Sequence, residues 1–307
     1  MLLALYLIAV LSTVAATARA VPRFAFLGVA GGVATLAAFA AGAFLDAPSP
    51  ARGACWVYGI ALLGKVLALG RSPVGGGIGV GRGLAYLFLW PGLYARRAYV
   101  PDPTVDRRAG LASAGLGALE VVAGLLLSSL AASRGWFEMG SFPSAWVRLF
   151  AFGSFLDGGF RGLEGVLAGL GYRPERIFRR PWAAGDPADF WANRWNRFVG
   201  RTLALEVYAP AKRRVGRLAA LLATFLASGV LHEALFRGST PGPVGRYLAF
   251  FLLHGLAVAA SARGPAPTRR GRIVRRALSW AFLLATAPLF FGGCYPAVVP
   301  LELVLGR

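Results

Sequence analysis

The chain has 307 residues, of which 57% are hydrophobic and 15% are charged. Soluble domains carry about 25% charged residues, so this chain cannot cover a water-exposed surface of its size, and a soluble globular fold is excluded. Its 33 basic and 13 acidic residues give a net charge of +20. The arginines lie between apolar runs rather than along one stripe. This distribution indicates the basic loops of a membrane protein and not a nucleic-acid interface.

Nine apolar segments approach the length of about 20 residues that crosses a bilayer. The well-defined spans are Leu2–Ala18, Phe24–Leu45, Ala109–Ala132, Leu218–Phe236, Tyr247–Ala262 and Ala277–Gly293. Less regular segments are Ala54–Leu69, which carries a lysine, the amphipathic Ser144–Leu170, and Leu84–Ala95, which contains Pro91 and is short enough to be re-entrant. We therefore predict an all-α polytopic integral membrane protein with eight or nine spans. Residues 1–307 are expected to form a single membrane-embedded domain with a functional core at about 144–262.

The first span imitates a signal peptide because it ends in Ala-Thr-Ala-Arg-Ala. It lacks a basic n-region and more apolar spans follow at once, so we expect a retained first membrane helix.

Orientation follows from the basic loops, which stay in the cytoplasm. Tyr172–Arg217 holds eleven basic against four acidic residues, and Arg263–Arg276 holds six arginines and no acid. Two spans separate these segments, so both are expected to be cytoplasmic. The N-terminus then lies outside if Leu84–Ala95 does not cross the membrane, and inside if it does.

Charged side chains inside spans are costly and mark either function or ion pairs. Asp157, Arg161 and Glu164 share one helical face and can pair with each other. Lys65 and Glu120 can also pair across helices. These positions fit either a structural stripe or the wall of a reaction chamber.

Metal and nucleotide sites are not expected. Cys55 and Cys294 have no CxxC neighbour and fit buried small hydrophobes. The run Gly59–Val66 lacks the Ser or Thr of a P-loop and lies in an apolar span. No second histidine follows His232 by four residues, so the HExxH zinc motif is absent.

Both histidines of the chain lie in predicted spans. A neutral imidazole there can accept a proton from a substrate hydroxyl; the alternative is a hydrogen bond between helices. His232 belongs to Ser228-Gly-Val-Leu-His-Glu233, whereas His254 lies in no motif.

The most informative segment contains three tryptophans within fourteen residues, beside arginines and ahead of a span. It runs from Arg180-Pro-Trp182 to the block Phe190-Trp-Ala-Asn-Arg-Trp-Asn196. Such a composition suits the membrane interface, so an aromatic anchor is one interpretation.

The second interpretation comes from a resemblance. The block 190–196, followed by 228–233, resembles the FWxRRWN-like and SGxxHE-like blocks of the wax synthase-like branch of the membrane-bound O-acyltransferase superfamily. Leu89-Trp-Pro-Gly92 resembles an early WPG element of such proteins. Asn193 stands where plant-type members usually carry Arg, so the acceptor stays open. The resemblance implies a helical bundle with an internal reaction chamber.

The resemblance also implies the chemistry. A fatty acyl group would pass from acyl-CoA, a co-substrate and not a cofactor, to a lipophilic alcohol, giving a wax ester or related neutral lipid without a covalent intermediate. His232 would be the general base and Asn196 an oxyanion donor. We expect substitutions to matter most at His232, less at Glu233 and least at His254. The expected residues of the acyl-CoA and substrate site are Phe190, Trp191, Asn193, Arg194, Trp195, Arg197 and Glu233.

Alternatives remain open at this point. The same fold can acylate a terpenoid, sterol, diacylglycerol or sugar, and a lipid or solute transporter without chemistry is the competing class. The cytoplasmic arginines, chiefly Arg179, Arg180, Arg194 and Arg197, are either CoA phosphate ligands or topology determinants. The expected location is a bacterial inner membrane, or the endoplasmic reticulum if the source is eukaryotic.

Overall fold

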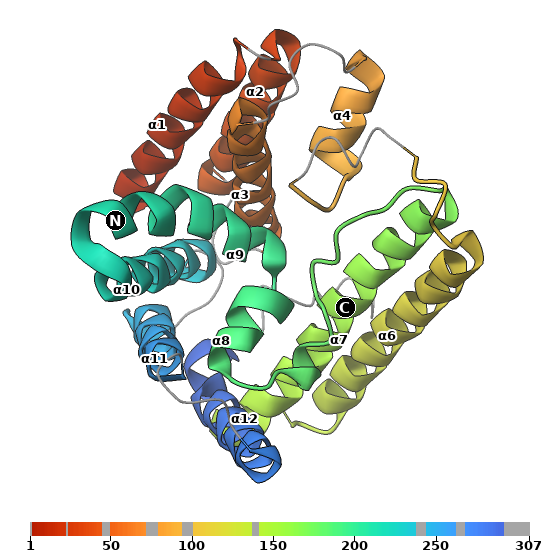
Figure 1. The fold of residues 1–307 in the computed structure, drawn as a ribbon, viewed down its shortest axis with the longest axis vertical. Helices are drawn as coiled ribbons and strands as arrows, with labels where there is room; N and C mark the ends of the chain where they lie inside the picture. Colours follow the sequence, from red (N-terminus) through yellow and green to blue (C-terminus); the bar gives the residue numbers. More distant parts are fainter. Residues whose placement is uncertain are drawn as a thin grey trace. The chain divides into compact units, whose positions relative to one another are not determined.

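The computed structural model describes residues 2–22, 24–44, 50–71, 79–93, 101–136, 141–237, 244–261 and 268–291. Every regular element in these ranges is a helix, as predicted (Figure 1). The chain divides into two compact units: Met1–Glu120 with Gly158–Arg176, and Val121–Asp157 with Ile177–Arg307.

Each predicted span contains a helix, although α4 starts before the predicted Leu84 and ends at Leu89, ahead of Pro91. The helices are α1 (Leu2–Ala20), α2 (Ala25–Phe44), α3 (Pro50–Arg71), α4 (Val80–Leu89), α6 (Arg107–Ser133), α7 (Ser141–Gly169), α10 (Ala209–Arg237), α11 (Arg246–Ser261) and α12 (Arg269–Phe291). α10 is broken at Gly216, whose φ of 79° and ψ of 175° are not helical, so its second part begins where the span at Leu218 was predicted.

Three of the described helical segments are long and apolar enough to cross a membrane: Arg107–Ser133, Arg197–Glu233 and Arg269–Phe291. α6 presents large exposed apolar side chains, among them Leu119 (66% exposed) and Leu126 (64% exposed). Apolar surface of this kind is stable in lipid and unfavourable in water.

The described parts of both basic segments contain helices. Arg263–Arg276 was expected to be a loop, but α12 begins at Arg269 and residues 263–267 lie outside the described residues. Tyr172–Arg217 contains several short helices, given below. Hydropathy places the end of each helix at the first charged residues. Arginine favours helix about as well as leucine does, so the helix can continue past that point.

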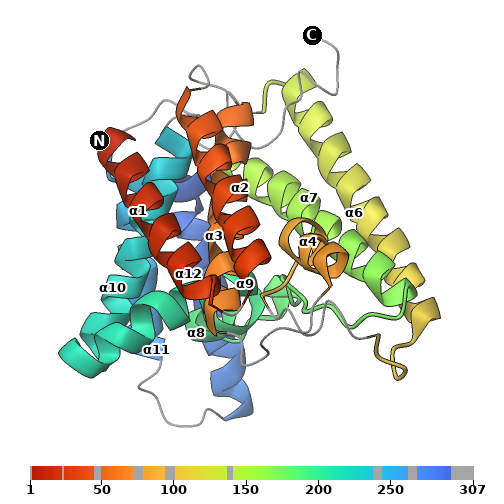
Figure 2. The ribbon, with the colours of Figure 1, turned by 90° about the horizontal axis from the view of Figure 1, so that it is seen from above.

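In the first unit, α1, α2 and α3 lie side by side (Figures 1 and 2), and α2 also contacts α4. Their core includes Val66, Leu69 and Leu87, each 1% exposed or less. Gly31 allows the close approach, because a Cβ there would lie 2.7 Å from the Val66 side chain.

Lys65 holds the end of α4 rather than pairing with Glu120. Its Nζ donates to the carbonyls of Tyr86 (2.9 Å) and Leu87 (2.8 Å). Pro91 has no N–H for the Leu87 carbonyl, and the Trp90 N–H donates to Ala85 instead of Tyr86. A buried ammonium thus satisfies two carbonyls at the negative end of the helix dipole. Cys55, in the same helix, is half-buried, and Cys294 lies outside the described residues.

The true partner of Glu120 is Arg161, from α7, in an ion pair within the first unit. Arg161 thus pairs with a carboxylate of another helix, whereas the sequence pattern had offered Asp157 and Glu164 on its own helix. Glycines let the two helices approach near this pair: a Cβ on Gly117 would lie 2.8 Å from the Gly162 Cα. Small residues are the usual means of close helix contact in membranes.

In the second unit, Trp146 of α7 compensates for a proline in α12. Pro288 lacks the N–H that would bond the Leu284 carbonyl one turn earlier. The Trp146 indole N–H donates to that carbonyl at 2.9 Å. This bond ties α7 to α12 at a position where the helix is missing one of its own bonds.

Candidate active site

The aromatic block, residues 190–196, lies within a series of short helices in the second unit. They are η1 (Pro181–Ala183), α8 (Pro187–Asp189), η2 (Phe190–Arg194), α9 (Arg197–Leu203) and η3 (Ala204–Tyr208). η2 is a π-helical turn, closed by the bond from Trp195 N–H to the Phe190 carbonyl (2.8 Å). π-turns are rare and are found frequently at functional sites.

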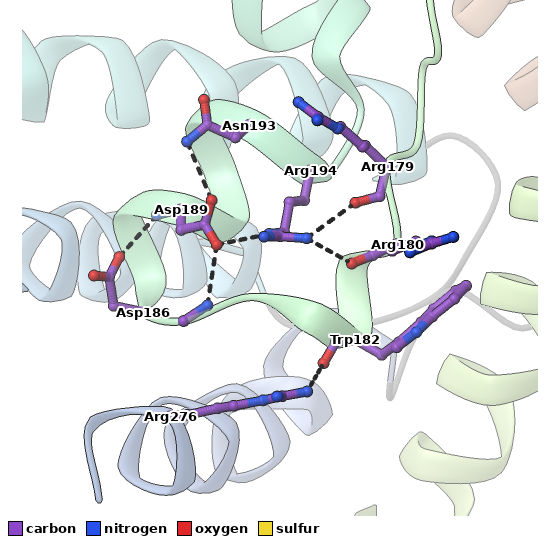
Figure 3. A network of polar contacts seen from close by, with 9 residues as sticks. Arg179, Arg180, Trp182, Asp186, Asp189, Asn193, Arg194 and Arg276 are labelled. Atoms are coloured by element: carbon purple, nitrogen blue, oxygen red, sulfur yellow. Dashed lines mark hydrogen bonds and ion pairs between the residues drawn. The ribbon is translucent and has the colours of Figure 1, made fainter. Parts of the chain in front are cut away.

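A polar network centred on Asp189 fixes this block (Figure 3). The Asp189 carboxylate accepts hydrogen bonds from Gly185 N–H (3.0 Å), Arg194 Nε (2.6 Å) and Asn193 Nδ2 (3.1 Å). Partial burial alone would raise the pKa of Asp189, but the bonds from Gly185, Arg194 and Asn193 outweigh it and hold the pKa below its ordinary value. Asp189 is therefore a carboxylate at neutral pH.

Arg194 and Asn193 are engaged inside this network. Besides its ion pair with Asp189, Arg194 donates to the carbonyls of Arg179 (3.4 Å) and Arg180 (3.3 Å). The side chains of Arg179 and Arg180 are exposed, and neither guanidinium takes part in the network drawn in Figure 3. Of the predicted phosphate-binding arginines, these two are the ones free to meet a ligand.

The aromatic rings of the block pack inward. Phe190 stacks on Trp195 with ring centroids 5.5 Å apart and contacts Trp280 of α12 at 6.4 Å. Trp191 points toward α11, where it contacts Phe251 at 5.6 Å. The block is thus a packed element of the second unit. Trp182, which precedes the block in η1, is instead 52% exposed, and Arg276 of α12 donates to its carbonyl at 2.9 Å.

His232 is held in one tautomer. Its Nδ1 lies 2.7 Å from the Ser228 carbonyl, one turn earlier in α10. A carbonyl can only accept, so Nδ1 carries the proton and the neutral ring keeps a lone pair on Nε2. Phe251 and Phe290 contact the ring at 4.5 and 5.3 Å. His232 is therefore a base in aromatic surroundings with its accepting nitrogen unused among the described residues.

Small residues before His232 allow α10 and α11 to approach. A Cβ on Gly229 would lie 3.0 Å from the Leu248 Cα. The neighbouring Glu233 is 6% exposed and accepts a hydrogen bond from Tyr247 N–H (3.2 Å) in the first turn of α11. A carboxylate there satisfies an unpaired helix N–H and meets the positive end of the helix dipole. This contact gives Glu233 a structural role.

Asn196 caps α9. Its backbone is left-handed, with φ 36° and ψ 60°, and its Oδ1 accepts from Val199 N–H at 3.3 Å. Asparagine tolerates this conformation better than most residues do. The Nδ2 group has no hydrogen bond among the described residues. The next residue, Arg197, is partly buried, and its backbone N–H donates to Ile177 (2.9 Å).

Four of the predicted site residues fall into two groups. Trp191 and His232 share a contact with Phe251, which brings the aromatic block next to the histidine motif. Asn193 and Arg194 surround Asp189. No hydrogen bond joins Asn196 to His232 among the described residues. His254, which the motif left out, turns out to bond Trp191.

No group of three or more His, Cys, Asp or Glu that could hold a metal occurs among the described residues.

Comparison with known proteins matches this same segment. Residues 174–253, which include both motif blocks, match the membrane bound O-acyl transferase family. In Arabidopsis thaliana, probable long-chain-alcohol O-fatty-acyltransferase 7 is 39% identical over 127 residues, covering 38% of this chain and 37% of the relative. Probable long-chain-alcohol O-fatty-acyltransferase 2 is 34% identical over 143 residues, covering 42% and 40%.

A further plant relative is acyl-CoA–sterol O-acyltransferase 1, 28% identical over 131 residues, with 38% of this chain and 37% of the relative covered. The matches thus span about two fifths of the curated relatives or less. The resemblance predicted from the two motif blocks is confirmed: residues 174–253 carry the pattern of the membrane bound O-acyl transferase family, and the chain is similar to its wax synthase-like branch.

Proposed function

We propose that the protein is a membrane-embedded O-acyltransferase that moves a fatty acyl group from acyl-CoA to a long-chain alcohol. The observation that carries the proposal is the position of His232 inside the matched segment, with Nδ1 bound to the Ser228 carbonyl and Nε2 free to accept a proton. The relatives' names, long-chain-alcohol O-fatty-acyltransferases, supply the acceptor class.

In this proposal, His232 Nε2 takes the proton of the alcohol hydroxyl as its oxygen attacks the thioester carbonyl. Formation of the new C–O bond gives a tetrahedral intermediate with an oxyanion, and the Asn196 amide stabilises this oxyanion by donating a hydrogen bond. The C–S bond then breaks, and the departing CoA thiolate takes the proton from His232. The products are an ester and free CoA. No acyl-enzyme is involved, so attack and departure take place in one internal chamber.

Arg179 and Arg180 are the proposed ligands of the CoA phosphates, because both guanidinium groups are exposed and outside the Asp189 network. Arg194 is proposed to act indirectly, by holding the carbonyls of these two residues in place. Asn193, Trp195 and Arg197 belong to the same supporting block.

The membrane topology is part of the proposal. α4 has ten residues and rises about 15 Å, half of the roughly 30 Å hydrocarbon core. We therefore propose that it does not cross, which leaves eight spans, an external N-terminus and a cytoplasmic 172–217 segment. The relatives named above come from a plant, so they give no support to a bacterial inner membrane over the endoplasmic reticulum.

Single-cysteine labelling tests the topology. Exposed Ala192 and Thr268 each take a cysteine in a background without Cys55 and Cys294. Both should resist an impermeant reagent in intact cells and react after permeabilisation. Rapid labelling of either site from outside would reverse the orientation.

Lipid analysis tests the reaction. The protein is expressed in a host without neutral-lipid synthases, and cultures receive a fatty alcohol, a sterol or a diacylglycerol. We expect wax ester in the first culture and none in a matched culture expressing His232→Asn. Ester only with the sterol or diacylglycerol would change the acceptor. Alcohol uptake or export with no ester from any acceptor would favour a transporter.

A further inference from the structure

His254 of α11 is fully buried, at 0% exposure, and both of its ring nitrogens are occupied. The Trp191 indole N–H donates to Nδ1 at 3.0 Å, and Nε2 lies 2.9 Å from the Thr286 hydroxyl oxygen. An indole nitrogen can only donate, so Nδ1 must be the lone pair and the neutral ring carries its proton on Nε2.

The remaining bonds follow from this tautomer. Nε2–H donates to the Thr286 oxygen, and the Thr286 hydroxyl donates to the Phe282 carbonyl of α12 at 2.9 Å. A directed chain of hydrogen bonds thus runs from the aromatic block through α11 to the backbone of α12. The two histidines hold opposite tautomers, because His232 is protonated on Nδ1.

His254 is not available as a base. A second proton on its ring would place an N–H against the indole N–H of Trp191 inside an aromatic packing of Phe250 (4.0 Å) and Phe282 (4.8 Å). Both ring nitrogens are already used in hydrogen bonds to Trp191 and Thr286. The role it can perform is therefore geometric.

Trp191 links His254 to His232 through a ring contact with Phe251. The indole contacts Phe251 with ring centroids 5.6 Å apart, and Phe251 contacts the His232 ring at 4.5 Å. Displacing the indole would move the wall against which His232 packs. In a densely packed interior such a shift is not absorbed locally.

We propose that His254 is a positioning residue that anchors Trp191 by a hydrogen bond and thereby fixes the Phe251 wall beside His232. The proposal rests on the acyl transfer proposed above. It gives His254 a role that the motif alone did not predict, since the motif placed His254 last in importance.

Two isosteric substitutions separate the anchor from simple bulk. In His254→Asn, the side-chain oxygen occupies about the place of Nδ1 and can accept from Trp191. In His254→Gln, the amide instead reaches about the place of Nε2 and can bond Thr286, which leaves the buried indole donor without its partner. An unsatisfied buried donor is costly, so we expect kcat to fall about 10-fold or more in the Gln variant and within about 3-fold in the Asn variant.

Trp191→Phe supplies the matched control. It removes the indole donor, so it should lower kcat, and adding His254→Gln to it should cost little more, because both changes break the same bond. Additive losses in the double variant, or equal losses in the Asn and Gln variants, would overturn the anchoring role.

A readout without activity completes the test. Labelling the eight tryptophans with ¹⁵N gives indole N–H resonances in detergent, and Trp191→Phe identifies the one that belongs to Trp191. This resonance should stay in place in His254→Asn and move upfield in His254→Gln, while the others stay unchanged. An unmoved resonance in the Gln variant would overturn the hydrogen bond. If the wild type forms no ester, the proposed function fails, and the resonance alone decides whether His254 holds Trp191.

Discussion

Replacing Asn196 tests whether its side-chain amide, rather than its place at the start of α9, is what the reaction needs. The residue combines a left-handed backbone with a cap on Val199 N–H. Alanine is strained in this conformation by about 1–2 kcal/mol and loses a cap worth roughly 1 kcal/mol. Asn196→Ala should therefore destabilise the protein by about 2–3 kcal/mol and is a poor test by itself.

Asn196→Asp keeps the capping oxygen and removes the Nδ2 donor. Its unfolding temperature should match that of the wild type, while ester formation should fall about 10²–10³-fold, the usual cost of one oxyanion donor. Asn196→Gly is the uncharged control: glycine accepts the left-handed backbone, loses only a few tenths of a kcal/mol as a cap, and should lose as much activity.

The assay is ester formation from labelled acyl-CoA and fatty alcohol in membranes, normalised to folded protein, beside thermal unfolding in detergent. A near wild-type rate in both the Asp and the Gly variant would refute the oxyanion role of the amide. An Asp variant as unstable as the Ala variant would refute the capping argument.

Two further predictions concern the supports of the site. Because the pKa of Asp189 is held below its ordinary value, its carboxylate stabilises the folded block fully above about pH 4, and this contribution is lost as pH falls through the lowered pKa. Acid unfolding of Asp189→Asn should therefore start from a less stable protein and change less between about pH 5 and 2; parallel acid profiles would contradict this. Trp146→Phe should cost about 1 kcal/mol by leaving the Leu284 carbonyl unpaired, and adding Pro288→Ala, which restores the helical donor, should recover much of the lost unfolding temperature. No recovery in the double variant would show that the indole bond does not compensate for the proline.

Most of the helical framework could be predicted from the sequence because each span is a long apolar run. The predicted span at Leu218–Phe236 even begins beside Gly216, the break in α10. The sequence was less informative where charged residues lie within helices or pair between them. α12 continues into its arginine-rich first turns, and Arg161 pairs with Glu120 across two helices rather than with neighbours on its own.

The site was predicted from its motifs but not from its contacts. His232 and the aromatic block could be found because their residue types and order are distinctive. The bond between Trp191 and His254 joins positions 63 residues apart, and no periodicity encodes it. A signal did exist for Asn196, since asparagine just ahead of a helix is a typical N-cap. Glu233 was expected at the substrate site, and its bond to Tyr247 N–H shows that it caps the start of α11.

The most direct test of the whole account is the rate of acyl transfer in His232→Asn. Asparagine keeps a donor for the Ser228 carbonyl, where Nδ1 now lies, and removes the accepting nitrogen Nε2. Ester formation from labelled acyl-CoA and fatty alcohol should fall at least 10²-fold, within the roughly 10²–10⁴-fold range for a lost general base, at an unchanged level of folded protein. Glu233→Gln, beside it in the helix, should lose less. If His232→Asn keeps more than about a tenth of the wild-type rate, the proposed mechanism is wrong.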